Sequence, residues 1–400
     1  MPGSRAVVHS WRVWLCLALT VAAGMAGTRI PVLEAQGPSQ AAAPSVHVKS
    51  TPANVVFGVF PIDRAPIARV ASGTVVRIDT LSHRGTTQRE DPVAFLGALG
   101  VQPGEVLQDV RDVWAARETI SAGGRGGGGG GHILTGPVYI EGAAPGDTLA
   151  IEMLEMSTRV PYGINATSST SGAFAASYGA APAGTPADNV PAIPQGTIHL
   201  IRTGMAGGRH VAFFSDTIQV PMNPFMGTMA VAPQSPTVSQ PGVQVEGVQS
   251  SGPPGLYGGN LDFRELKTGS TLYLPVYHPG ALFYVGDPHG TQGDGEVSGN
   301  ALEQSLTGVF RFTVIKGKTI AGPRAEDATH YYLMGIDLDL DRAMRKAVLE
   351  TVDFLVKEKG LTAAKALSLC SIAIDFRVAE VVDGTQVIVG SVPKSLFLTK

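Results

Sequence analysis

The chain has 400 residues, of which 44% are hydrophobic and 16% charged, so it can bury a sizeable core. A formal net charge of -3 gives no basic field for nucleic acid, and we expect no nucleic-acid partner. The 50 glycines and 28 prolines favour many turns and short strands over long helices. Composition therefore predicts a globular, mainly β protein.

The N-terminus has the pattern of a secretory signal peptide. Two arginines precede the apolar stretch 13–23, and small residues follow it. The uncharged stretch 13–27 is shorter than the roughly 20 residues that a membrane-spanning helix needs, so cleavage is expected and no stable membrane anchor should remain. We expect residues 1–35 to hold the signal peptide and the start of a linker, and the mature chain to be exported, either periplasmic or secreted.

Residues 36–240 are predicted to form an N-terminal β domain. Alternating polar and apolar residues predict short β segments over 46–78, and a helix is expected near 92–99. The glycine-rich run 123–131 lacks the Lys-Ser/Thr that follows a phosphate-binding loop. It is therefore predicted to be a flexible surface insertion.

The second half of this domain begins with two predicted strands, 138–141 and 148–152, joined by a tight Pro-Gly turn. Residues 157–197 are rich in Ser, Ala, Gly and Pro and are predicted to be loop. A loop of that length is either a lid over a site or partly disordered. Strand character returns over 198–235.

The rest of the chain divides into a central β segment, 241–320, and a C-terminal α/β portion, 321–400. In the latter, apolar residues at three- and four-residue spacing predict a helix over 340–356. Thr362 is expected to cap a shorter second helix, and Asp383-Gly384 predicts a closing hairpin. The predicted fold class is mainly β (α+β), with a β-sandwich or barrel-like body and a smaller C-terminal α/β portion.

Polar side chains gather in the motif GDPHGTQGDGE, residues 286–296. Asp287 and His289 are two residues apart, so on an extended segment they point to the same side, and so do Asp294 and Glu296. The glycines between the pairs allow tight turns that would bring both pairs to one centre. Mixed carboxylate and imidazole ligands suit zinc or another divalent metal. The alternative is a Gly/Asp-rich surface turn that binds calcium or nothing.

Other ionisable residues are weighed against plain structural roles. His132 follows the glycine run and is either a further ligand or an exposed loop residue. His83 would reach a site only across a turn, and Glu303 fits a plain surface charge. Cys370 lies on an apolar helical face and fits the core. None of the last three is placed in the predicted site.

Several stretches around the motif match a known pattern. They are Gly258-Gly-Asn-Leu-Asp262, Gly286-Asp287, His289, Gln292-Gly-Asp-Gly-Glu296 and His132-Ile-Leu-Thr-Gly-Pro137. Over nearly the whole mature chain the sequence resembles the acetamidase/formamidase family. The resemblance implies hydrolysis of small amides with release of ammonia, a largely β fold, a divalent metal and a homo-oligomer. The metal is commonly zinc, and calcium is kept as an alternative.

The resemblance also suggests site residues, which are carried over by matching positions. The expected metal ligands are His132, Asp287 and His289. The expected catalytic residues are Glu296, as general base, and Asp294. The expected substrate-binding residues are Asn260, Asp262 and Gln292.

The sequence thus predicts an exported, metal-dependent hydrolase of the linear C–N bond of small carboxamides. A metal-bound water would attack the amide and give carboxylate and ammonia, because a catalytic metal lowers the pKa of bound water to about 7. The alternative is an exported, non-catalytic metal- or ligand-binding protein on the same β scaffold. Such a protein would be free to lose Glu296.

Overall fold

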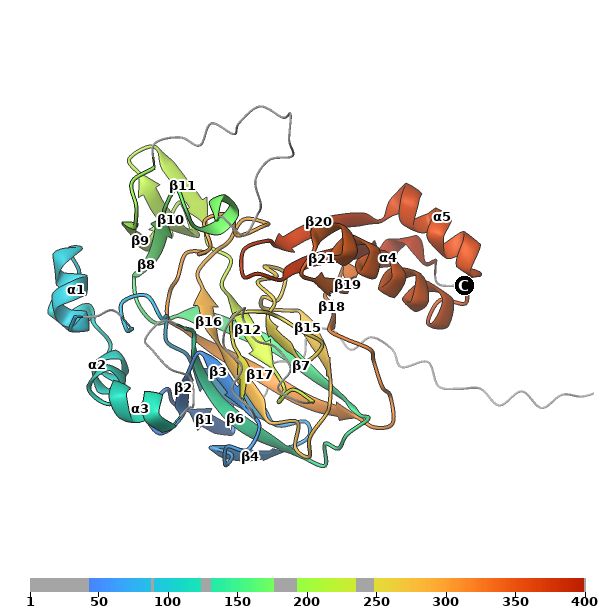
Figure 1. Ribbon diagram of the computed structural model, residues 1–400, viewed down its shortest axis with the longest axis horizontal. Helices are drawn as coiled ribbons and strands as arrows, with labels where there is room; N and C mark the ends of the chain where they lie inside the picture. The colour runs from blue at the N-terminus through green and yellow to red at the C-terminus, as the bar shows by residue number, and fades with distance from the viewer. Residues whose placement is uncertain (1–42, 88–89, 124–130, 176–192, 235–247, 399–400) are drawn as a thin grey trace, which may run out of the picture. The chain divides into compact units, whose positions relative to one another are not determined.

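The structure is a computed structural model, and it describes residues 43–87, 90–123, 131–175, 193–234 and 248–398 (Figure 1). The predicted signal peptide lies outside these residues. So do most of the glycine-rich run and residues 176–192 of the predicted long loop.

Segments rich in β-branched and aromatic residues pair into a nine-stranded sheet. Its strands, in spatial order, are β1 (Val46–Val48), β5 (Val75–Asp79), β17 (Leu306–Ile315), β7 (Thr148–Thr158), β15 (Thr271–Pro275), β18 (Arg324–Glu326), β19 (His330–Asp337), β21 (Gln386–Pro393) and β20 (Asp375–Glu380). The strands come from all three regions named from the sequence, 36–240, 241–320 and 321–400. These regions share one sheet within the unit 42–400.

A six-stranded sheet packs against the first. Its strands are β14 (Gly258–Asn260), β12 (Phe225–Ala230), β16 (Phe283–His289), β6 (Ile133–Glu141) and β2 (Val55–Phe57), with β4 (Ala68–Ala71) also paired to β6. One buried core joins the inner faces of both sheets, and the ring of Phe283 on β16 lies 4.9 Å from that of Phe312 on β17. The body is a β-sandwich, and the predicted mainly β fold is confirmed.

Smaller elements surround the sandwich. They are the four-stranded sheet β11 (Ile218–Pro221), β10 (Arg209–Ser215), β9 (Thr197–Ala206) and β8 (Tyr162–Thr167), the pair β13 (Val248–Ser250) and β3 (Val59–Pro61), the helices α1 (Pro92–Ala98), α2 (Gln108–Ala115) and α3 (Arg117–Gly123), and the 3-10 turns η1 (Pro103–Glu105), η2 (Gly172–Phe174) and η4 (Lys394–Leu396). Helix α1 was predicted, but α2 and α3 were not. With 8 and 7 residues they are too short to give a clear periodic signal. Helix α1 also has only 7 residues, but Asp91 and Pro92 mark its start.

Strand β8 corrects the prediction of a loop over 157–197. It pairs along its length with β9, and its side chains Tyr162 and Ile164 join a core cluster with residues of α1 and α2. The small and polar residues around it hide this strand from a sequence pattern. The pairing with β9 and the apolar contacts with the helices stabilise it.

The C-terminal portion contains the helices α4 (Leu340–Lys357) and α5 (Ala363–Ala373), which lie beside β19, β20 and β21 (Figure 1). Asp339 caps α4 by accepting a hydrogen bond from the Arg342 N–H, and Thr362 caps α5 by accepting one from the Lys365 N–H. Both predicted helices and the closing hairpin of β20 and β21 are confirmed.

Small residues line the face of α4 that packs on the sheet. Ala343 and Ala347 are fully buried, whereas Met344 is 39% exposed. Gly335 on β19 explains this arrangement. A Cβ added there would lie 2.2 Å from the Ala343 carbonyl oxygen and from the Ala347 nitrogen, so the helix backbone rests directly on the strand.

Among the helices in the described part of the chain, none is long and apolar enough to cross a membrane.

We predict that Gly335→Ala destabilises the protein, because its methyl group would push α4 off the sheet. Overpacking of this kind costs about 1–3 kcal/mol, which thermal unfolding followed by circular dichroism would detect. The matched control is Gly97→Ala in α1, where nothing lies within 4 Å of an added Cβ. It should keep or raise the melting temperature, since alanine is the better helix former. Equal melting temperatures for the two variants would contradict the explanation.

Candidate active site

Strand β16 carries the first half of the motif to the end of the six-stranded sheet. It lies between β12 and β6, and both Asp287 and His289 on it are buried. The Oδ2 atom of Asp287 lies 3.2 Å from Nε2 of His289. The prediction that these two side chains meet is confirmed.

His289 is the centre of a cluster of carboxylates. Its Nε2 atom lies 3.3 Å from Oε1 of Glu303 and 3.9 Å from Oε1 of Glu296. On the other side of the ring, Nδ1 lies 3.0 Å from Oε1 of Gln292 and 3.7 Å from Oδ1 of Asp262. All four neighbours are buried, so the three carboxyl groups among them are shielded from water.

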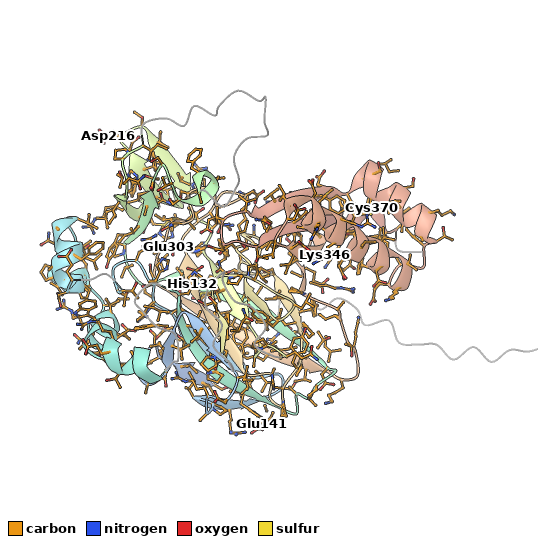
Figure 2. The ribbon with its side chains drawn as sticks, in the orientation of Figure 1. His132, Glu141, Asp216, Glu303, Lys346 and Cys370 are labelled. Atoms are coloured by element: carbon orange, nitrogen blue, oxygen red, sulfur yellow. The ribbon has the colours of Figure 1, made fainter. Side chains whose placement is uncertain are left out.

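Two further histidines approach Asp287 from distant parts of the chain. His132, just before β6, has its Nε2 atom 3.8 Å from Oδ2 of Asp287. His83, which follows β5, has Nδ1 3.6 Å from Oδ1 of Asp287 and 3.5 Å from Oε2 of Glu303. Figure 2 labels His132 and Glu303, which are far apart in the sequence. The three predicted metal ligands, His132, Asp287 and His289, are therefore brought together.

The C-terminal hairpin adds two more acids to the cluster. Asn260 donates hydrogen bonds from its amide nitrogen to Oδ2 of Asp262, at 2.6 Å, and to Oδ2 of Asp383, at 2.5 Å. The Asp383 backbone N–H donates to Oε1 of Glu380 at 3.1 Å. The hairpin of β20 and β21 thus closes one side of the site.

Several buried polar atoms of this cluster have no hydrogen-bond partner among the described residues. They are His83 Nδ1, Asp262 Oδ1, Asp287 Oδ1, His289 Nε2, Glu303 Oε2 and Glu380 Oε2. The Asp287 oxygen near His289 Nε2 is close but not aligned for a hydrogen bond. Leaving such atoms unpaired in a protein interior is costly, so clusters of them indicate a missing partner.

The ligand atoms of three sets of side chains lie within 4.8 Å of one another. The sets are His83, Asp287 and Glu303; Asp262, His289 and Glu296; and Asp262, Glu380 and Asp383. Carboxylates mixed with imidazoles are the ligands that divalent transition metals and zinc take in proteins. The residues present therefore fit a divalent cation.

Burial and like charge shift the pKa values of the acids. Burial, helped by neighbouring carboxylates, raises the pKa of Asp262 and Glu296 well above the ordinary range. Burial alone would also raise the pKa of Asp287, but the charges of His132 and His289 outweigh it and hold that pKa well below its usual value. Burial likewise raises the pKa of Asp383 to about 6. A bound cation would relieve this repulsion.

Three of these acids have unusual backbone conformations. The φ angles of Asp262, Asp287 and Glu296 are 41°, 50° and 47°, in the left-handed region that non-glycine residues rarely adopt. Such conformations cost energy and persist where the surrounding structure enforces them, as they do at functional sites. The packing of the sandwich therefore holds these three residues in a backbone conformation that they rarely adopt, with their carboxyl groups inside the cluster.

Gly227 on β12 leaves the room that the cluster occupies. A Cβ added there would lie 2.4 Å from Oδ1 of Asp262, 2.7 Å from Oδ2 of Asp287 and 2.8 Å from Cε1 of His289. Any side chain at this position would displace these groups.

Asp294 does not join the cluster, which corrects the prediction that it acts beside Glu296. The chain leaves the strand at His289 and turns, so the alternation expected of an extended segment does not hold beyond it. The side chain of Asp294 is 32% exposed and pairs with Arg377 and Arg264 on the surface. Glu296 alone of this pair points inward.

Asn260 and Gln292, predicted to bind substrate, use their amide groups within the protein. Asn260 accepts a hydrogen bond from the Thr228 hydroxyl in addition to the two that it donates. Gln292 contacts His289 Nδ1 and donates to the Asp262 backbone oxygen at 2.6 Å. These bonds orient Asp262 and His289, as partners behind metal ligands do.

Sequence reasoning left out four members of the cluster: His83, Glu303, Glu380 and Asp383. His83 and Glu303 had been interpreted as plain structural or surface residues. Asp383 carried only a turn signal. Each of them contacts residues that are far away in the sequence, and no local spacing pattern predicts such contacts.

Comparison with known proteins agrees with this geometry. The sequence profile of the Acetamidase/Formamidase family matches residues 129–241 and 240–399, more than half of the chain. Formamidase of Methylophilus methylotrophus is 26% identical over 310 residues, which span 63% of this chain and 73% of that protein. A putative formamidase of Schizosaccharomyces pombe is 29% identical over 200 residues, 42% of this chain and about half, 47%, of that relative's length.

Solved structures show the same fold. An acetamidase from Bacillus halodurans superposes with a TM-score of 0.66 at 24% identity, covering 88% of this chain and 98% of that one. An acetamidase from Yersinia enterocolitica gives a TM-score of 0.66 at 22% identity, covering 90% and 95%.

Sequence and fold together define the class of this protein, because the chain belongs to the acetamidase/formamidase family. Family membership places it among the amidases, hydrolases that act on carbon–nitrogen bonds other than peptide bonds.

We predict that Gly227→Ala lowers the rate of amide hydrolysis by roughly a hundredfold, because misplacing reactive groups by about 1 Å has that effect. The control is Gly104→Ala, which has open space around the added methyl group and should keep wild-type turnover. Full activity of Gly227→Ala would show that the cluster's geometry is not needed for turnover.

Proposed function

We propose that the protein is a metal-dependent amidase that hydrolyses the linear C–N bond of small carboxamides to carboxylate and ammonia. The observation that carries the proposal is the set of unpaired, buried imidazole and carboxylate atoms that converge on Asp287 and His289. The names of the relatives, formamidase and acetamidase, suggest amides as small as formamide and acetamide.

The cation would be held around Asp287, the residue that three histidines approach. His132 and His289 were expected as ligands from the sequence, and His83 and Glu303 are added by the geometry. Histidine ligands favour zinc over calcium, which takes oxygen ligands. When bound, such a cation polarises an amide carbonyl and makes water more acidic.

Glu296 is proposed to move the proton. Its carboxylate is buried at the cluster, and burial together with the charge of Asp262 raises its pKa well above the ordinary range. Its Oε1 atom can accept a proton from the attacking water and return it to the departing nitrogen. Without that proton the departing group would be the amide anion, NH2−, which is a very poor leaving group; with it, neutral ammonia leaves.

We further propose that the enzyme is exported and forms homo-oligomers. Export is supported by the signal-peptide pattern of residues 1–35. The proposal of a homo-oligomer rests on the family resemblance.

The test combines elemental analysis of the purified protein with ammonia release from a panel of primary amides, with and without a chelator. We expect a bound divalent metal, turnover that the chelator abolishes, and recovery when the metal is restored. Bound metal with no ammonia from any amide would instead favour a non-catalytic binding protein.

Glu296→Gln should lower kcat by about 10²- to 10⁴-fold, the usual contribution of a general acid–base group, while the metal stays bound. The matched control is Glu155→Gln, an exposed carboxylate on β7, which should leave kcat unchanged. Full turnover by metal-loaded Glu296→Gln would remove Glu296 from the chemistry.

A further inference from the structure

The loop that carries Glu296, residues 290–299, has little secondary structure of its own. Besides a bond from the Ala173 N–H to the Val297 carbonyl oxygen at 2.9 Å, two backbone hydrogen bonds join it to the end of β20. The Gly295 N–H donates to the Ala379 carbonyl oxygen at 2.9 Å, and the Val381 N–H donates to the Gly295 carbonyl oxygen at 3.3 Å. The position of Glu296 therefore depends on how the loop is joined to the C-terminal hairpin.

A bidentate ion pair reinforces this attachment. Arg377 on β20 donates from Nε to Oδ2 of Asp294 at 2.9 Å and from Nη2 to Oδ1 at 3.0 Å. Nε of Arg264 also lies 3.0 Å from Oδ1 of Asp294. Arg377 in turn contacts Glu265, whose other oxygen pairs with Lys267 at 2.7 Å. Two parallel bonds fix the direction of both side chains as well as their distance.

The place of this ion pair in the chain suggests its role. Asp294 lies two residues before Glu296, and Arg377 lies three residues before Glu380, another acid of the cluster. Isolated surface ion pairs contribute about 0–1 kcal/mol to stability. Side chains that are 27% and 32% exposed therefore add little to the stability of the fold. Their two parallel bonds do fix the position of the loop relative to β20.

We propose that Arg377 and Asp294 form a clamp that positions Glu296 by fixing the loop 290–299 to strand β20. The inference rests on the proposed function, in which Glu296 moves the proton. Both clamp residues are positioning residues and do not touch the reacting atoms. Glu296 needs such support because its φ of 47° is strained, and a loosened loop would relax it away from His289.

The test uses Arg377→Gln, Asp294→Asn and the double variant of the full-length protein. Each single change should lower kcat by roughly 10- to 100-fold, as a small misplacement of a catalytic group does, with KM changed by less than about threefold. The double variant should be no slower than the slower single variant, because both break one clamp. Arg377→Lys keeps the positive charge but lacks the planar guanidinium that makes two parallel bonds. It should therefore retain more of kcat than Arg377→Gln but less than the wild type.

Hydrogen–deuterium exchange of the peptide that covers residues 291–299 gives a second measurement, independent of turnover. Its amides should exchange faster in Arg377→Gln than in the wild type.

The matched control is the ion pair of Arg311 on β17 with Glu152 on β7, which is 2.7 Å long and has exposures of 30% and 33%. Arg311→Gln should leave kcat and the exchange of residues 291–299 unchanged, with a melting temperature similar to that of Arg377→Gln. An equal loss of kcat in Arg311→Gln would overturn the clamp, since general stability would then explain the effect.

The clamp would also be overturned if Arg377→Gln changed neither kcat nor the exchange of residues 291–299. If the wild-type protein released no ammonia from any amide, the proposed function would fail. Exchange would then decide the clamp alone, and an unchanged rate at residues 291–299 would overturn it.

Discussion

The constraint on which the rest of the structure depends is the burial of several carboxylates around His289 at the end of β16. Like charges in a water-poor interior repel, and each unpaired oxygen loses its solvation. Protons, hydrogen-bond donors, imidazolium groups or a cation offset that cost. The histidines around Asp287 supply part of the compensation, and the atoms left without partners in the described structure indicate where a cation would supply the rest.

Many features of the fold serve this cluster. The sandwich brings β12, β16 and β6 side by side, so residues that are distant in sequence share one sheet end. Gly227 leaves space at its centre. The C-terminal portion supplies Glu380 and Asp383 to the cluster. Its Arg377 also binds Asp294 on the loop that carries Glu296. The site is therefore built by the whole unit, although its motif occupies a short stretch.

The sequence predicts well the features that depend on residues close together in the chain. Apolar spacing predicts α4 and the Thr362 cap predicts α5. The two-residue spacing of Asp287 and His289 succeeds because β16 continues through both residues, although the φ of Asp287 is 50°. The same rule fails for Asp294 and Glu296, since the chain turns there. Strand β8 and residues such as His83 escape prediction for a common reason: their partners lie far away in the sequence. Tertiary contacts, which no local pattern encodes, decide their roles.

The most direct test of the central claim is the location of the metal in crystals of the active enzyme. An anomalous difference map recorded at the absorption edge of the metal found by elemental analysis should show a peak between Asp287 and the histidines around it. Ligand distances of about 2.0–2.2 Å are expected for zinc bound by imidazole and carboxylate. A fully active, ammonia-releasing enzyme with no metal in this cluster would contradict the account.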